Sequence, residues 1–108
     1  MALKIIGQLR PSSGIGTYEE VGSPTLGQAR VISTLVLCNT DASNADSFIV
    51  AVKKGAGAPT AANIIYRGTL PPTESFVATN GITLEEDAHL WVATASGYVT
   101  VTAFGDES

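Results

Sequence analysis

The sequence predicts an all-β fold, an antiparallel sandwich of about eight strands with a jelly-roll or immunoglobulin-like arrangement. Short runs rich in β-branched and aromatic residues recur along the chain, separated by clusters of Gly, Pro, Asn and Asp. These turn signals return roughly every 8–12 residues, which is the spacing of sandwiches and barrels. No segment has the apolar periodicity of an amphipathic helix, and residues 56–62 have room for one helical turn at most.

The N-terminal half supplies four of the expected strands. In the first, Leu3, Ile5 and Leu9 lie on one face and Lys4 and Gln8 on the other, as the alternation of a strand requires. The second is weaker, and the third is the most apolar run of the chain. In order, the four are residues 3–9, 16–21, 28–39 and 47–53.

The C-terminal half supplies the other four, which are residues 63–70, 74–79, 88–95 and 98–104. Pro71 and Pro72 end the first of them, because proline cannot donate to a strand ladder. Asn80-Gly81 is a favoured hairpin pair, so we expect a tight turn there. Ser96-Gly97 is expected to fold the last two strands into a hairpin.

Length and composition indicate one domain that packs against neighbours. The 108 residues fit a single domain, 1–108, in which residues 1–10 are a candidate N-terminal arm strand. Charged residues make up only 15% of the chain, against about 25% in an average globular protein. Because a small domain has a large surface, much of that surface must be uncharged. Such a surface favours protein contacts.

Several partners are disfavoured by the sequence. The net charge is −4 and the few basic residues are scattered, so we expect no nucleic-acid partner. No run approaches the length of a membrane span, and the N-terminus lacks the apolar region of a signal peptide. The single cysteine excludes an internal disulfide. We therefore expect a protein made in a cytoplasm, with no membrane contact.

The strand around residues 31–38 is apolar on both faces, with Leu35 and Leu37 on one and Val36 and Cys38 on the other. A strand covered on one side only should alternate cleanly. Either its outer face is covered by a loop or by the N-terminal strand, or that face is buried against another subunit. The sequence leaves both explanations open.

No set of residues predicts catalysis, a metal or a cofactor. Cys38 ends the most apolar strand and is expected to be a small buried hydrophobe, and His89 lies within a strand. The carboxylates of residues 85–87 are consecutive and cannot all point one way, so a solvated turn is expected there. Residues 41–46 lack the central glycine and the closing glutamate of a calcium loop. We expect no enzyme.

Aromatic residues are the other candidates for contact. Trp91 lies on the strand face opposite to Leu90, so we expect it to point outward, where it either contacts protein or takes part in ordinary packing. Together with Tyr66 and Tyr98 it is alternatively a platform for a sugar.

The stretch from residue 30 to residue 105 resembles a family of small virion structural proteins of tailed bacteriophages. The blocks that carry this resemblance are residues 31–39 (VISTLVLCN), 47–52 (SFIVAV), 79–84 (TNGITL), 90–96 (LWVATAS) and 99–105 (VTVTAFG). These blocks mark strands and turns and contain no catalytic motif. The resemblance implies a β-sandwich displayed on a phage particle, either a head decoration (cement) protein or a tail or fibre component.

We therefore expect a non-enzymatic virion protein that binds and stabilises the capsid shell. Its expected partner is the major capsid protein, and its expected oligomeric state is a homo-oligomer, either a trimer or a dimer. The alternative is a tail or fibre module that binds a receptor or glycan. The N-terminal strand is expected to clamp a neighbour by adding to its sheet. The candidate interface residues are Leu3, Ile5, Ile6, Leu9, Leu35, Leu37 and Trp91.

Overall fold

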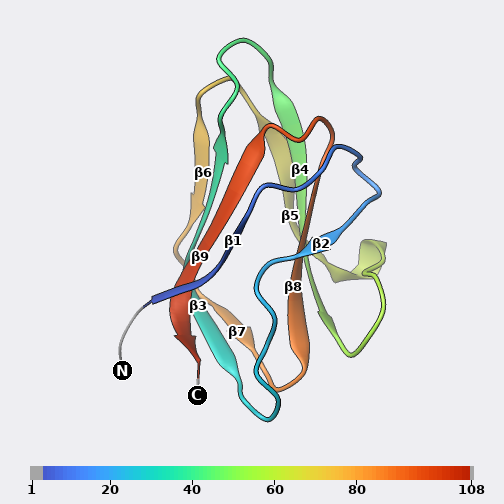
Figure 1. Ribbon diagram of the computed structural model, residues 1–108, viewed down its shortest axis with the longest axis vertical. Coiled ribbons are helices and arrows are strands. Elements are labelled where there is room, and N and C mark those ends of the chain that lie inside the picture. Colours follow the sequence, from blue (N-terminus) through green and yellow to red (C-terminus); the bar gives the residue numbers. More distant parts are fainter. Residues whose placement is uncertain (1–3, 108) are drawn as a thin grey trace.

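The protein is a sandwich of two antiparallel sheets in a computed structural model that describes residues 4–107 (Figure 1). The all-β prediction is confirmed. Sheet A contains, in spatial order, β1 (Lys4–Leu9), β9 (Val99–Glu107), β3 (Arg30–Asn39) and β6 (Ser75–Ala78), with β7 (Ile82–Leu84) also paired to β3. Sheet B contains β2 (Glu19–Glu20), β8 (Ala88–Thr94), β4 (Asp46–Lys54) and β5 (Ile64–Leu70).

The pairing of the strands is nested. The first strand pairs with the last, β2 with β8, β3 with β6 and β7, and β4 with β5. An immunoglobulin sandwich separates its first and last strands between its two sheets, whereas here they are neighbours. Of the two arrangements that the sequence leaves open, the strand order is that of a jelly roll.

The core lies between the sheets and is built from the alternate residues that each strand turns inward. The inward residues of β9 are Val99, Val101 and Ala103, all buried, and β8 contributes Leu90 and Val92. In this core Phe76 packs against Phe48 and Tyr66, with ring centroids 5.4 and 5.3 Å apart and the ring planes tilted.

Two bulges decide which residues face the core. The pairing of β1 with β9 shifts at Ile6, so Ile5 faces outward while Ile6 and Leu9 pack on the core. The predicted single face of Leu3, Ile5 and Leu9 is therefore wrong for Ile5 and Leu9, which point to opposite sides. Leu3 lies outside the described residues.

The second bulge is at Ser33 in β3 and turns Ile32, Leu35 and Leu37 inward together. It fits against Gly105, where an added Cβ would lie 1.9 Å from the carbonyl oxygen of Val31. Only glycine leaves room for the backbone at this point.

Both predicted hairpins are wrong. Asn80 and Gly81 do not join paired strands, because β6 and β7 both run along β3, as two segments of one strand would. The turn at Ser96 and Gly97 carries the chain from sheet B to sheet A, so β8 and β9 do not pair. The buried carboxylate of Asp46 fixes this crossover. It accepts hydrogen bonds from the backbone N–H groups of Ser96 at 2.8 Å and Tyr98 at 2.9 Å.

Helix is confined, in the part of the chain that the structure describes, to one 3₁₀ turn, η1 (Ala61–Asn63). This agrees with the single turn allowed by the sequence. None of the described helical structure has the length or apolarity to cross a membrane.

Candidate functional site

The outer face of sheet A is a surface that the fold itself does not cover. Paired residues of neighbouring strands point to the same side, so the outward rows follow from the register. We call this surface the bare face. Its members are Ile5, Gln8, Val31, Thr34, Val36, Cys38, Ser75, Val77, Thr83, Thr100, Thr102 and Phe104.

Apolar side chains are exposed along this face. Ile5, Phe104, Val31 and Val77 are between 37% and 53% exposed. They come from four strands, β1, β9, β3 and β6, and so extend across the whole width of sheet A. Scattered exposed hydrophobic residues are ordinary on protein surfaces, but a contiguous group typically marks a contact surface.

The polar residues of the bare face are uncharged, and several already have partners within the sheet. Gln8 Nε2 donates to Thr102 Oγ1 at 3.1 Å, and Ser33 Oγ in the bulge donates to the carbonyl of Phe104 at 3.1 Å. Asp106, paired with Val31, is the charged residue at one end of the face. The remaining polar groups of the face are uncharged, and covering them costs less than covering charged side chains would.

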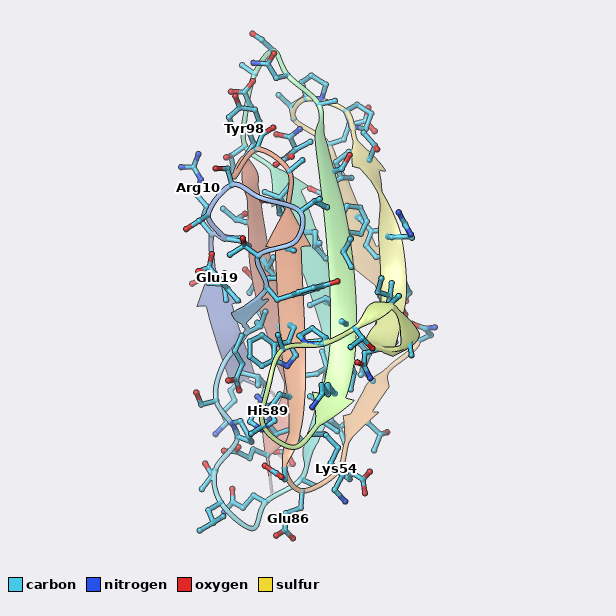
Figure 2. All side chains as sticks on the ribbon, turned by 90° about the vertical axis from the view of Figure 1, so that its right-hand side faces the viewer. Arg10, Glu19, Lys54, Glu86, His89 and Tyr98 are labelled. Atoms are coloured by element: carbon cyan, nitrogen blue, oxygen red, sulfur yellow. The ribbon has the colours of Figure 1, made fainter. Side chains whose placement is uncertain are left out.

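Sheet B differs, because the chain covers its outer side. Figure 2 shows that the segments 10–18 and 55–63 both cross in front of sheet B. The outward-facing Ala51 and Ala93 are completely buried, and Ile49 is 9% exposed. The loops thus cover the outer side of β8 and β4, the central strands of sheet B, while Ile65 on the edge strand β5 stays exposed and the outer side of sheet A stays open.

Hydrogen bonds hold both covering segments in place. Gly14 N–H donates to the Thr94 carbonyl at 2.9 Å, and Gly55 N–H donates to the Asp87 carbonyl at 2.9 Å. Within the described residues, β1 pairs at the edge of sheet A, so it extends the sheet and does not cover its outer side. The N-terminal strand is therefore not the cover that the sequence allowed for β3.

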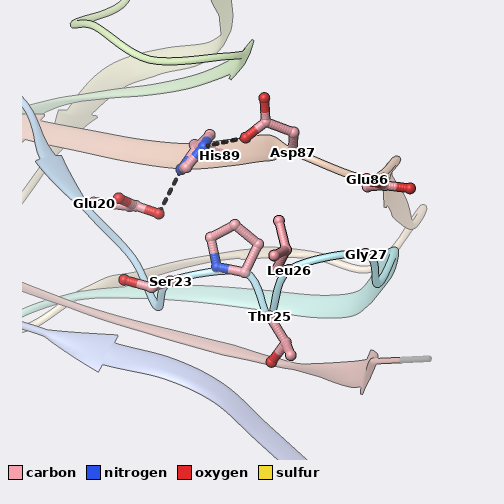
Figure 3. A pocket seen from close by; sticks show the side chains of 9 residues that line it. Glu20, Ser23, Thr25, Leu26, Gly27, Glu86, Asp87 and His89 are labelled. Atoms are coloured by element: carbon pink, nitrogen blue, oxygen red, sulfur yellow. Dashed lines mark hydrogen bonds and ion pairs between the residues drawn. The ribbon is translucent and has the colours of Figure 1, made fainter.

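A pocket of about 200 Å³ lies where β2 meets β8 (Figure 3). His89 is its central ionisable group: Nδ1 lies 2.7 Å from Glu20 Oε2 and Nε2 lies 3.3 Å from Asp87 Oδ1. A carboxylate only accepts hydrogen bonds, so both ring nitrogens must carry hydrogen for both contacts to be favourable. The hydrogen bond to Glu20 is the main cause that raises the pKa of His89, which burial partly opposes.

The loop beside this pocket is anchored at both ends. The Glu107 carboxylate accepts hydrogen bonds from Thr25 N–H and Oγ1, each at 2.9 Å, and these lower the pKa of Glu107. The buried Arg30 donates to the carbonyls of Gly22 and Ala88, both at 3.1 Å. These contacts tie the short edge strand β2 and the following loop to both sheets.

The pocket brings His89 together with carboxylates and not with Cys38. Both ring nitrogens of His89 contact carboxylates, and Cys38 lies on the other sheet, in β3. Across residues 4–107 there is no group of three or more side chains with the types and spacing of metal ligands.

The predicted interface residues do not come together. Leu35 and Leu37 are 1% and 0% exposed, so they are core residues and that prediction is wrong. Ile6 and Leu9 also pack on the core, and only Ile5 lies on the bare face. One edge of β1 is already paired with β9 of the same chain. The addition of this N-terminal strand to a neighbour's sheet stays a prediction.

Trp91 and the two tyrosines form no shared platform. Trp91 is half-buried on the outer side of sheet B, with its ring centroid 6.3 Å from that of His89. Tyr66 belongs to the aromatic cluster at the core. Tyr98 lies far from His89 along the long axis of the molecule (Figure 2). A role for Trp91 at an interface stays a prediction.

Val31, Val77 and Phe104 were missed as contact residues by the sequence reasoning. The signal for Phe104 was present, because residues 99–104 alternate between small apolar residues and Thr, Thr and Phe. For Val31, the bulge at Ser33 changes which side of the strand the residue faces relative to the rest of β3, and no residue type predicts a bulge there. Comparisons with protein-family models, with curated proteins and with solved structures find no match to this chain.

Proposed function

We propose that this chain is a non-enzymatic structural protein of a bacteriophage particle, a head decoration protein that packs its bare face onto a neighbouring subunit and stabilises the shell. The observation that carries the proposal is the contrast between the two sheets. Loops of the chain cover the centre of the outer side of sheet B, where Ala51 and Ala93 are buried, whereas Ile5, Val77 and Phe104 stay exposed across sheet A. An exposed apolar sheet face is typical of a protein contact surface.

The chemistry of the whole surface supports a role in an assembly. With 15% charged residues, the chain has few groups that must stay in water. The bare face is modest in size for a stable complex, but a symmetric shell presents many equivalent sites. Linked contacts of this kind gain strength through effective concentration, so each one needs only a weak affinity.

The assignment to a phage particle depends on the resemblance of residues 30–105 to small virion proteins. The blocks of this resemblance correspond to strands of both sheets, including β3, β8 and β9. They are the elements that form the sandwich and most of the bare face, so the resemblance concerns the scaffold and its contact surface.

Immunogold electron microscopy of intact particles tests the location. Antibody against this chain should label the head evenly, because a decoration protein occupies every equivalent site of the shell. Label confined to the tail or its tip would reject head decoration and support the tail or fibre alternative. Particles without label, although the protein is present in the infected cell, would reject a virion protein altogether.

A further inference from the structure

We propose that the bare face is occupied by a second copy of the same chain, packed face to face across a two-fold axis. This inference rests on the proposed function, since it names the neighbour that this surface contacts. It follows from three properties of the face: its charge, its paired polar groups and its area.

Charge favours a second copy over a different protein. The chain has a net charge of −4, so two copies repel wherever their acidic surfaces meet. The bare face brings together Ile5, Phe104, Val36 and Val77 with threonines, and no charged side chain lies among them. Specific partners of other kinds are usually selected through complementary charges, which this face does not offer.

The end of the face fixes the orientation of the copies. Asp106 lies beside Val31 at one end of sheet A, and Cys38 and Thr100 lie at the other. A two-fold axis perpendicular to the strands places the Asp106 end of one copy over the Thr100 end of the other. The two carboxylates are then separated by the length of the face, and the Phe104 row of each copy faces the Thr102 row of the other.

The polar groups of the face suit packing against an identical surface. Gln8 is bonded to Thr102 and Ser33 to the carbonyl of Phe104, so these groups need no partner from outside. Sheets pack face to face about 10 Å apart through interdigitating side chains. The side chains available for this are the exposed apolar residues of the face, Ile5, Val31, Val77 and Phe104.

The area matches a weak dimer. The strands β1, β9, β3, β6 and β7 contribute 6, 9, 10, 4 and 3 residues. At about 3.4 Å per residue and about 4.8 Å between strands, they span roughly 500 Å² in projection. Two copies bury roughly 1,000 Å² in total, which is near the lower limit for a specific interface.

Analytical ultracentrifugation of the purified chain tests this inference. The protein concentration is varied from about 1 µM to about 300 µM, the range in which a weak dimer with a small interface is expected to form. The wild-type chain is expected to form a dimer reversibly. Val77→Asp is expected to raise the dimer Kd at least tenfold, because two-fold symmetry places the new carboxylate in the interface twice. Val77 is about half exposed on an edge strand, so this variant should fold as the wild type does.

Ile65→Asp is the matched control, since Ile65 is an exposed β-branched residue on a strand of sheet B. Its dimer Kd should equal that of the wild type. A chain that is monomeric at every concentration, a trimer, or a dimer that Val77→Asp leaves unchanged would each overturn the inference.

The result is separable from the proposed function. A monomer in solution on particles that antibody labels over the head would refute the second copy and keep the virion protein. A dimer sensitive to Val77→Asp, with particles that remain unlabelled, would keep the second copy and refute the virion protein.

Discussion

Truncation should destabilise the protein much more on the inner face of sheet A than on its outer face, and comparing Leu37→Ala with Val77→Ala measures the difference. Leu37 is 0% exposed, between the sheets, whereas Val77 is 52% exposed on the outer face. Truncating a fully buried leucine removes its transfer free energy and leaves a cavity, which together cost about 2–5 kcal/mol. For Val77 about half of the removed surface is already in water, so the expected loss is about 0.5–1 kcal/mol.

A loss of about 3 kcal/mol is a large share of the total stability, which is roughly 5–15 kcal/mol for a chain of this size. In urea, with a slope of about 2 kcal/mol per molar, Leu37→Ala should lower the midpoint by about 1.5 M and Val77→Ala by less than about 0.5 M. Both variants should be unfolded at the lowest usable protein concentration, so that association does not contribute. Equal losses for the two variants would refute the assignment of the faces.

Substitutions at three further positions test particular contacts. Asp46→Ala removes the buried carboxylate that accepts from the N–H groups of Ser96 and Tyr98, and should cost about 3 kcal/mol in urea unfolding. Asp46→Asn should cost about half of that, because one acceptor remains. The pKa of His89 is raised in the folded state above its ordinary value of about 6.5. The stabilisation that protonated His89 contributes is therefore fully present below about pH 6.5, and it is lost as the pH rises through the higher, folded-state pKa. Unfolding followed from about pH 5 to about pH 8 should show this loss in the wild type and not in His89→Gln. Gly105→Ala brings a Cβ against the Val31 carbonyl and should cost about 2 kcal/mol or more, measured by thermal unfolding.

Each of these has an outcome that would contradict it. Asp46→Ala within about 0.5 kcal/mol of the wild type would mean that water replaces the carboxylate. A pH dependence that persists in His89→Gln would assign the effect to other groups. Gly16→Ala is the control for Gly105, since an added Cβ there meets nothing within 4 Å, and equal losses for both would exclude the close approach.

The sequence predicted the fold class and most strands because alternation and turn residues are local signals. The strand 28–39 was found nearly at its observed bounds, Arg30–Asn39, since its β-branched run is long and ends at turn-forming residues. The pairing was not predictable from the same signals. Asn80-Gly81 is a hairpin pair by local preference, yet the long-range ladder with β3 continues past it.

The candidate site was missed for a related reason. Whether Leu35 or Val36 faces the core depends on one extra residue, Ser33, and a shift of one residue exchanges the two faces of a strand. The bulge is fixed by contact with Gly105, about 70 positions further along the chain, so a local reading of β3 does not contain it. The bare face is also defined by the loops that cover the other sheet, which is a property of the whole fold.

The most direct test of the central claim is the incorporation of variants into particles. A phage that lacks this gene is propagated on cells that supply the wild-type chain, Val77→Asp or Ile65→Asp, and the chain is quantified in purified particles by mass spectrometry. We expect wild-type levels for Ile65→Asp and at least a tenfold loss for Val77→Asp. Equal incorporation of all three chains would contradict the claim that the outer face of sheet A is the surface by which this protein assembles.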